Sequence, residues 1–416
     1  MWGESVLEEY SLLEKFRDIV YYCFKCGMCR FESYEGIDNG ESLSSLFMDV
    51  CPMWDLWKLE AYTALGKNEI CRGLLEKKIP FNEKTVKIIY ACTLCGACEK
   101  QCSVSRKTKH IERFGGSLLP YNPLEIALAL RLQAVKTGVG PLPQHKKFSE
   151  SIRVNKNPYW EPHQDRFKWF KGSLPKEAET AYFVGCTASY RQQMIAENAV
   201  KIFNKLGVEF TLVDEWCCGS PLFTTGQEEF IKELAIHNIS VLEDAGVRRL
   251  IVSCAGCYRT FKKVYPEILG ENLPFQVLHM AEFLSEKIEK GRLNFTSTIN
   301  EKITYHDPCH LGRHCGVYEA PRRVLAKIPG LRFTEMRRKI DHSYCCGAGA
   351  GFRAAFPEAS VKVAGLRVKE AEELGVDSLV TACSFCRRNL DDGVKAVDGK
   401  IKVYNIEELV AKAMGC

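Results

Sequence analysis

The chain has 416 residues, of which 46% are hydrophobic and 26% are charged, and its formal net charge is +5. This length is sufficient for two or three domains, and the mild, dispersed positive charge includes no basic tract of the kind that nucleic-acid binding requires. No run of 18 apolar residues occurs, and the N-terminal residues are too acidic and too interrupted for a signal peptide. We therefore expect a cytoplasmic protein that binds no nucleic acid, has no membrane span of its own and reaches a membrane only through a partner subunit.

Helical segments and eight clustered cysteines make up the first part of the chain, residues 1–140. Helices are expected over residues 8–22, 53–65 and 123–136. In a reducing compartment, closely spaced cysteines are more typical of metal ligands than of disulfides. One run has the C-x2-C-x2-C-x3-C spacing that binds a cubane [4Fe–4S] cluster, and it consists of Cys92, Cys95, Cys98 and Cys102. A second run has the same opening and a fourth cysteine displaced by an insertion, and it consists of Cys23, Cys26, Cys29 and Cys51.

The two runs are expected to exchange their fourth ligands, as the two runs of a two-cluster ferredoxin do. One cubane set would then be Cys23, Cys26, Cys29 and Cys102. The other would be Cys92, Cys95, Cys98 and Cys51. Ser103 follows Cys102 where the usual run has proline, but this difference removes no ligand. A zinc ribbon is the alternative for CxxC pairs, although each CxxCxxC triplet has one thiolate too many for half of a ribbon.

Residues 141–176 are rich in proline, lysine and aromatic residues and show no clear periodicity, so we expect a linker that packs on the surface. Beyond it, short apolar runs alternate with amphipathic ones. Strands are expected over residues 181–184, 209–213, 249–252, 302–305, 332–335 and 378–381. Helices are expected over residues 191–206, 228–243, 321–327 and 357–374. This alternation predicts two α/β domains with mainly parallel sheets, residues 177–297 and 298–416, so the expected fold class is α/β plus α.

Ten of the 21 cysteines form one pattern that occurs twice, at the expected ends of strands, where open α/β sheets bind their ligands. Each copy has a lone cysteine, an adjacent pair followed by glycine, and a CxxC pair. The first set is Cys186, Cys217, Cys218, Cys254 and Cys257, and the second is Cys309, Cys345, Cys346, Cys383 and Cys386. The Cα atoms of adjacent cysteines lie about 3.8 Å apart, less than an unstrained disulfide prefers, so each pair is expected to present two thiolates to one metal centre. Five thiolates are one more than an ordinary cubane cluster uses.

Over nearly its whole length, the chain resembles proteins with paired CCG domains, and most closely the catalytic subunits of heterodisulfide reductases. The segments that carry the resemblance in the first copy are FVGCTASY (183–190), WCCGSPLF (216–223) and SCAGC (253–257). In the second copy they are YHDPCHLGRH (305–314), CCGAGAGFR (345–353) and TACSFC (381–386). Two cubane motifs followed by two CCG domains are similar to the D subunit of the membrane-linked methanogen enzyme.

The resemblance implies a helical ferredoxin-like domain followed by two CCG domains that are related by pseudo-two-fold symmetry. It also implies that the ten repeated cysteines are catalytic and that each five-cysteine set binds a noncubane [4Fe–4S] cluster. A disulfide such as coenzyme M–coenzyme B would lie between the two noncubane clusters and be reduced with electrons from the two cubane clusters. The expected partners are this small disulfide and other subunits of a redox complex, namely a flavoprotein, a ferredoxin-like protein or a membrane cytochrome b.

An electron-transfer subunit without a substrate of its own is the alternative. The same architecture occurs in iron–sulfur subunits of lactate, glycolate and glycerol-3-phosphate oxidising systems, which pass electrons between a flavoprotein and a quinone or ferredoxin. Those relatives commonly keep fewer of the cysteines. Because this chain retains all ten, the resemblance favours a site that binds substrate sulfur.

Five further residues were considered as candidates. Two of them have two possible roles each, and the other three are expected to take no part in the reaction. His310, beside Cys309, could deliver a proton or hydrogen-bond a cluster sulfur. Arg353 could pair with an anionic substrate group or form a salt bridge. Cys71 and Cys315 are expected to be small buried side chains, and Cys416 is expected to have no role. No dinucleotide- or phosphate-binding loop occurs, so a flavin or nicotinamide would belong to another subunit.

Overall fold

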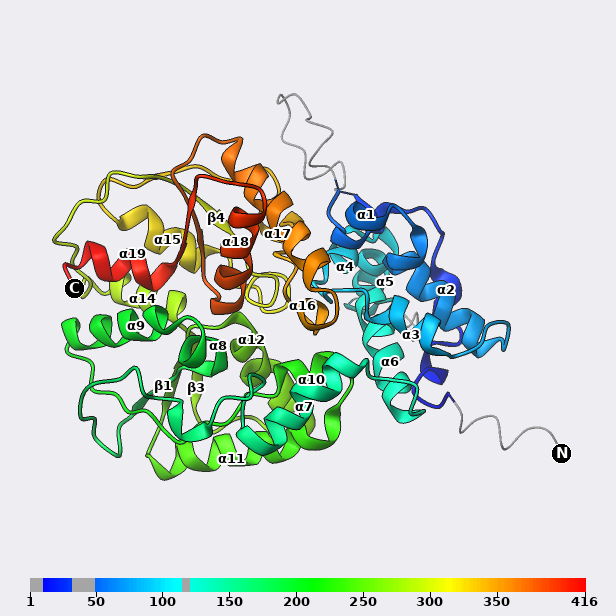
Figure 1. Cartoon of the computed structure of the whole chain (residues 1–416), viewed down its shortest axis with the longest axis horizontal. Coiled ribbons are helices and arrows are strands. Elements are labelled where there is room, and N and C mark those ends of the chain that lie inside the picture. Colours follow the sequence, from blue (N-terminus) through cyan, green and yellow to red (C-terminus); the bar gives the residue numbers. More distant parts are fainter. Residues whose placement is uncertain (1–9, 32–48, 114–119) are drawn as a thin grey trace. The chain divides into compact units, whose positions relative to one another are not determined.

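The fold was analysed in a computed structural model, which describes residues 10–31, 49–113 and 120–416 (Figure 1). The chain divides into two compact units. The first, here called the helical unit, comprises Met1–Lys146, Pro221–Glu228 and Arg337–Val363. The second, here called the sheet unit, comprises Lys147–Ser220, Glu229–Met336 and Ala364–Cys416. None of the described helices is both long enough and apolar enough to cross a membrane.

In the described residues of its N-terminal stretch, the helical unit contains short 3-10 turns and six α-helices. The turns are η1 (Glu14–Phe16), η2 (Ile19–Tyr22), η3 (Met28–Arg30) and η6 (Glu60–Tyr62). The helices are α1 (Pro52–Trp57), α2 (Ala64–Leu75), α3 (Glu83–Tyr90), α4 (Ala97–Gln101), α5 (Ser103–Arg113) and α6 (Pro123–Lys136). Its later segments add η10 (Ile340–His342) and α16 (Phe352–Ala355). Three helices continue across a boundary between the units: α7 (Pro143–Asn155), α10 (Ser220–Thr224) and α17 (Pro357–Glu372).

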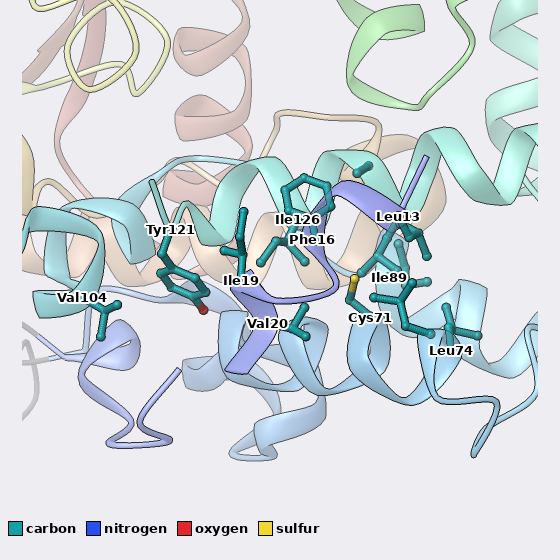
Figure 2. Packing of buried hydrophobic residues seen from close by; sticks show 13 residues of the cluster. Leu13, Phe16, Ile19, Val20, Cys71, Leu74, Ile89, Val104, Tyr121 and Ile126 are labelled. Atoms are coloured by element: carbon teal, nitrogen blue, oxygen red, sulfur yellow. The ribbon is translucent and has the colours of Figure 1, made fainter. Parts of the chain in front are cut away.

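An apolar core joins the N-terminal turns to α2 and α6 in the helical unit (Figure 2). Leu13 and Phe16 of the first turns pack with Leu74 of α2 and Ile126 of α6, and all four side chains are buried. The start of α6 follows from local chemistry, because the side chain of Asn122 accepts a hydrogen bond from the Leu124 N–H at 2.9 Å and Pro123 occupies the first helical position. The predicted helix over residues 123–136 is therefore confirmed.

Two other helical predictions for this unit are wrong in detail. Residues 10–22, the described part of the predicted helix 8–22, form separate 3-10 turns, whose side chains reach the apolar core in spite of the poorer backbone geometry. The predicted helix over residues 53–65 is interrupted at Lys58, which has a left-handed backbone conformation (φ 48°). The chain therefore ends α1 there, turns through η6 and begins α2 at Ala64.

The sheet unit contains two parallel sheets. The first has the strand order β1-β2-β3, with β1 (Thr180–Phe183), β2 (Arg249–Val252) and β3 (Gln276–His279). The second has the order β5-β4-β6-β7, with β4 (Lys302–His306), β5 (Arg332–Phe333), β6 (Ser378–Thr381) and β7 (Lys402–Asn405). All neighbouring strands run parallel, as the alternation of apolar and amphipathic segments predicts.

Helices connect and cover these strands. Those of the first half are α8 (Gly185–Tyr190), α9 (Gln193–Lys205), α11 (Ile231–Asp244), α12 (Ala255–Arg259), the π-helical turn η9 (Thr260–Val264), α13 (Tyr265–Leu269) and α14 (Met280–Glu289). Those of the second half are α15 (Glu319–Lys327), α18 (Ser384–Ala396) and α19 (Ile406–Ala413). Two further 3-10 turns are η7 (His163–Asp165) and η8 (Glu228–Phe230). Across the halves, α19 packs on α9 and α15 packs on α14.

One predicted strand of this part of the chain is wrong. Residues 209–213 do not form a strand, because Thr211 makes only an isolated bridge to Ala181. The segment 141–176, expected to be a linker that packs on the surface, contains the helix α7 (Pro143–Asn155) and the turn η7. The other predicted strands are found to within two residues. The strands β3 and β7, which the sequence prediction did not include, complete the two sheets.

Candidate metal centres

A pocket in the helical unit gathers the four cysteines of one predicted cubane set. Its lining includes Cys51, Cys92, Cys95 and Cys98 together with apolar side chains and the buried Lys67. Cys51 lies immediately before α1, Cys92 and Cys95 lie between α3 and α4, and Cys98 lies in the first turn of α4. Four soft thiolate donors in an apolar pocket fit an iron–sulfur cluster better than a hard cation.

The electrostatics of this pocket agree with its use as a metal site. Burial raises the pKa of Cys51 to about 12, and the neighbouring Cys92 and Cys95 thiols contribute to this rise. Burial also raises the pKa of Cys98 well above its ordinary value, again with Cys95 and Cys92 as neighbours. Thiols this close together do not ionise readily by themselves, whereas a bound metal deprotonates its thiol ligands outright.

The other predicted cubane set lies around Cys23 and Cys102. Cys23 and Cys26 lie close enough to Cys102 to raise its pKa, and the Ser105 N–H points at the Cys102 sulfur from 3.5 Å. Burial raises the pKa of Cys29 to about 12, and Cys51, Cys102 and Cys23 lie near enough to contribute. Cys102 therefore lies near cysteines of the first run, and Cys51 lies near cysteines of both runs, so the exchange of fourth ligands stays a prediction.

The two CxxCxxC turns share one unusual backbone conformation. In the first, Lys25 and Gly27 have left-handed φ angles of 55° and 74°. At the equivalent positions of the second, Leu94 and Gly96 have φ angles of 46° and 76°. A left-handed conformation is strained for a residue with a side chain. Its occurrence at the same position in both turns indicates that the turns are shaped to converge three sulfurs on one point.

The first five-cysteine set lies wholly in the sheet unit as a continuous chain of hydrogen-bonded thiols. Its order is Cys186, Cys217, Cys218, Cys257 and Cys254. These hydrogen bonds hold the pKa of Cys186, Cys218 and Cys254 below the ordinary value and raise that of Cys217 and Cys257 well above it. The five sulfurs are therefore already gathered as a cluster site would need them.

Secondary structure explains this gathering. Cys186 follows β1 at the start of α8, and Cys254 follows β2 and caps α12. Because β1 and β2 are parallel neighbours, their carboxyl ends lie at one edge. Gly185 is required there, since a Cβ at this position would lie 3.1 Å from the Cys257 sulfur and its φ is 74°. Asn238 fixes the adjacent pair by accepting from the Trp216 N–H at 2.8 Å.

Residues of the supposed linker complete the first set, which the sequence prediction missed. The Arg166 guanidinium donates from Nη2 to the Cys186 sulfur at 3.5 Å and from Nη1 to Glu215 Oε1 at 2.7 Å. The carbonyl of Lys156 accepts from the Cys217 N–H at 2.8 Å and from Arg166 Nη2 at 3.0 Å. Asp165, Lys168 and Lys171 flank Arg166 in the sequence, so no local signal distinguishes its role.

Three cysteines of the second set lie in the sheet unit, and two lie in the helical unit. Cys309 follows β4, Cys383 follows β6 and caps α18, and Cys386 lies in the first turn of α18. Cys345 and Cys346 belong to the helical unit. There the following residue, Gly347, has φ 85°, and a Cβ on it would lie 2.7 Å from the Ser360 carbonyl oxygen, so glycine is required.

The two CxxC pairs meet within the sheet unit. The thiol of Cys254, from the first copy, is hydrogen-bonded to the thiol of Cys383, from the second. Asn405, at the end of β7, holds Cys383 in place by accepting from its N–H at 2.9 Å. The carboxyl ends of β2 and β6 therefore bring one CxxC pair of each copy together.

The remaining candidate residues are placed as follows. His310 is 8% exposed and lies near Cys254, and burial together with Arg259 lowers its pKa to about 3. Arg353 lies on α16 in the helical unit. Cys71 is fully buried among apolar side chains of α2, α6 and the N-terminal turns (Figure 2). Cys315 is only partly buried, contrary to expectation, and Cys416 is exposed.

Comparisons with known proteins agree with this arrangement. Residues 180–262 and 303–391 match the cysteine-rich CCG domain, and residues 19–105 match a 4Fe-4S dicluster domain. The chain is 41% identical to the D subunit of the dihydromethanophenazine:CoB–CoM heterodisulfide reductase of Methanosarcina barkeri, over 79% of this chain and 78% of that protein. It is 37% identical to the corresponding protein of Methanosarcina mazei, over 94% of this chain and 93% of that protein.

More distant matches share parts of the same architecture. The EtfAB:quinone oxidoreductase of Syntrophomonas wolfei is 30% identical over 82% of this chain and 48% of its own length. Among solved structures, a hypothetical protein from Helicobacter pylori has a TM-score of 0.56 at 11% identity, covering 98% of this chain and 77% of that protein. The latter similarity concerns the fold alone.

Proposed function

Because the chain belongs to the family of heterodisulfide reductase D subunits, we propose that it is the subunit that reduces a disulfide in a multi-subunit redox complex. The family makes it an iron–sulfur oxidoreductase. The observation that carries the finer proposal is the contact between Cys254 and Cys383, because it brings a CxxC pair from each copy to one place. Splitting a disulfide into two thiols consumes two electrons and two protons, and two adjacent one-electron sites match that demand.

We propose that the chain holds two cubane and two noncubane [4Fe–4S] clusters. The first cubane set is Cys23, Cys26, Cys29 and Cys102, and the second is Cys51, Cys92, Cys95 and Cys98. The ten repeated cysteines hold the noncubane clusters. When bound, such clusters carry single electrons. The donors fit them, because all are soft sulfur ligands, and the cysteines of the second cubane set and of the first five-cysteine set lie close together.

A pseudo-two-fold relation between the CCG domains is part of this proposal. It is supported by reciprocal helix packing, in which α19 of the second half packs on α9 and α15 packs on α14 of the first half. The equivalent N-caps His279 and Asn405, at the ends of β3 and β7, add to this support. Such a relation would present two equivalent sites to the two sulfurs of one disulfide.

The protein's own residues hold the sulfur ligands in position and shield them from water. Cys186, Cys217, Cys218 and Cys257 are each less than 9% exposed, so the sulfur ligands of the first set are removed from bulk water. Asn405 and Asn238 fix the backbone of Cys383 and Trp216 through their side-chain oxygens. We further propose that a flavoprotein, ferredoxin-like or cytochrome b subunit supplies the electrons, and that the protein works in the cytoplasm, at the membrane only through such a partner.

An electron-transfer subunit remains the second candidate, because a relative named EtfAB:quinone oxidoreductase matches 82% of this chain. To distinguish the two, the anaerobically purified, reduced protein is mixed with coenzyme M–coenzyme B disulfide and the released thiols are counted. The reductase is expected to release two thiols for each disulfide, and Cys383→Ser is expected to abolish release while Cys71→Ser leaves it unchanged. Oxidation of the reduced clusters by a quinone analogue without thiol release would support the electron-transfer subunit instead.

Iron and sulfide analysis tests the cofactor content separately. Four four-iron clusters correspond to about sixteen irons for each chain. A content of about eight irons would contradict the noncubane clusters, whatever the outcome with the disulfide.

A further inference from the structure

Arg166 and Glu215 form an ion pair in the sheet unit, directly beside the first five-cysteine set. Each side chain is 1% exposed, and Nη1 of Arg166 lies 2.7 Å from Oε1 of Glu215. The other terminal nitrogen, Nη2, faces the Cys186 sulfur at 3.5 Å. Burial opposes both charges and raises the pKa of Glu215 to about 7, but the 2.7 Å contact with Arg166 and two backbone N–H donors favour the ionised carboxylate. Cys186 and Glu215 outweigh the cost of burial for Arg166 and raise its pKa, so the guanidinium stays charged.

Glu215 is fixed by the same turn that carries Cys186. Its Oε2 accepts from the Val184 N–H and its Oε1 from the Gly185 N–H, both at 2.8 Å. The pair therefore has a defined orientation, with its positive end toward the sulfur and its negative end toward the backbone donors. A buried pair with this many hydrogen bonds costs less to desolvate than an isolated charge.

The second copy cannot build the same pair. Glu215 stands two residues before the adjacent cysteines of the first copy, and Ser343 stands at that position in the second. Gly185 stands immediately before Cys186, and Pro308, which has no N–H, stands immediately before Cys309. Asp307 of that turn binds Arg322 instead, at 2.7 and 2.9 Å. The two five-cysteine sets therefore have different charged supports in spite of their matching cysteines.

We propose that Arg166, oriented by Glu215, is a positioning residue that raises the reduction potential of the centre at the first five-cysteine set. The proposal rests on the proposed function, in that a cluster must be bound by Cys186 and its four companions. Hydrogen bonds to thiolate ligands and nearby positive charge both stabilise the reduced, more negative form of an iron–sulfur cluster. The segment that joins the two predicted domains is thereby part of the redox site.

The test is an anaerobic redox titration of the full-length protein, followed by electron paramagnetic resonance, in Arg166→Met and Glu215→Gln. For Arg166→Met, one cluster midpoint is expected to fall by about 59 mV, which corresponds to a tenfold change in the one-electron equilibrium. For Glu215→Gln the same midpoint is expected to rise, because the cation remains and its counter-charge is lost. If Arg166 had only a structural role, the midpoint potential would not shift in opposite directions in the two variants.

Two further variants complete the design. Arg153→Gln, in α7 of the same segment, removes a cation whose side chain is 51% exposed, and all midpoints are expected to match the wild type. If Arg166→Met does not fold, Arg166→Lys replaces it. This variant keeps a positive charge without the forked guanidinium donors, and its midpoint potential is expected to fall by less than that expected for Arg166→Met. A lower frequency of the Fe–S(Cys) stretch in the wild type than in Arg166→Met, by resonance Raman spectroscopy, would indicate the hydrogen bond directly.

The outcomes separate this inference from the proposed function. Variants with full iron content whose midpoints are unchanged, or move in the same direction, would overturn the inference alone. A wild-type protein with only about eight irons would overturn the noncubane clusters and this inference together.

Discussion

Arg131 of α6 donates from Nη2 to the carbonyl oxygen of Cys92 at 2.6 Å. The same guanidinium donates from Nη1 to the carbonyls of Thr224 and Ala350, at 2.7 and 2.8 Å. One fully buried side chain therefore connects the turn that carries three cysteines of a cubane set to two distant segments of the helical unit. This makes the cluster pocket dependent on a residue that contributes no sulfur.

Replacement of Arg131 by methionine is expected to lower the stability of the protein. The change removes the side-chain donor of five backbone carbonyls, those of Ile89, Tyr90, Cys92, Thr224 and Ala350. Each buried carbonyl left unsatisfied costs about 1–3 kcal/mol, partly offset by the apolar side chain. The urea midpoint, followed by circular dichroism under anaerobic conditions, measures the loss. Lys136→Met, in the same helix but exposed, is the matched control, and an equal loss in both variants would contradict the argument.

His145 is expected to make stability fall in mild acid. Its Nε2 lies 3.0 Å from the Gly351 carbonyl oxygen, and burial, with Arg131 nearby, lowers its pKa to about 4 from 6.5. The unfolded chain therefore binds the proton first, so stability is fully present above about pH 6.5 and decreases as the pH falls toward about 4. About 2 kcal/mol should be lost between pH 7 and pH 5.

The measurement is the urea midpoint at both pH values in the wild type and in His145→Gln, which does not titrate. The variant should be less stable at pH 7, yet its stability should change less with pH. The same pH dependence in both proteins would show that another group is responsible.

Variants of Cys51 and Cys71 together test the assignment of Cys51 as a ligand of a cubane cluster. Burial raises the pKa of each thiol to about 12. Only Cys51 lines the pocket with Cys92, Cys95 and Cys98, whereas Cys71 packs among apolar side chains. Cys51→Ala is therefore expected to lose about four irons or to weaken one cluster signal, while Cys71→Ala retains the wild-type iron content. Iron loss from the Cys71 variant alone would refute the assignment.

Lys67 is expected to raise the potential of the cubane cluster in that pocket. Burial lowers the pKa of Lys67, but the Cys92 and Cys51 thiols favour its charged form, and its Nζ donates to the Tyr62 carbonyl at 2.7 Å. Lys67→Met should lower one midpoint by about 59 mV, a tenfold change in the reduction equilibrium. Lys87→Met, on the exposed face of α3, is the control, and an unchanged midpoint in a fully loaded Lys67 variant would rule out the effect.

The sequence by itself determined the ligand chemistry and the type of most elements. Cysteine spacing is a local property, because two thiols within four residues reach one metal centre in nearly any turn. The repeated cysteine pattern likewise predicted equivalent sites at the ends of β1, β2, β4 and β6. The alternation of apolar and amphipathic runs likewise predicted the parallel sheets, and the helix expected from Pro123 begins at that residue as α6.

Tertiary structure alone decided which distant side chains surround those cysteines. Residues 141–176 have no periodic pattern, and the sequence predicts only a linker that packs on the surface. In the structure, Arg166 of this segment contacts the Cys186 sulfur, and the Lys156 carbonyl accepts from the Cys217 N–H. The strand expected at residues 209–213 is replaced by a single bridge, since only Thr211 finds a partner. Contacts such as Cys254 with Cys383 join residues far apart in the chain, and no local pattern encodes them, because they depend on how the two sheets fold together.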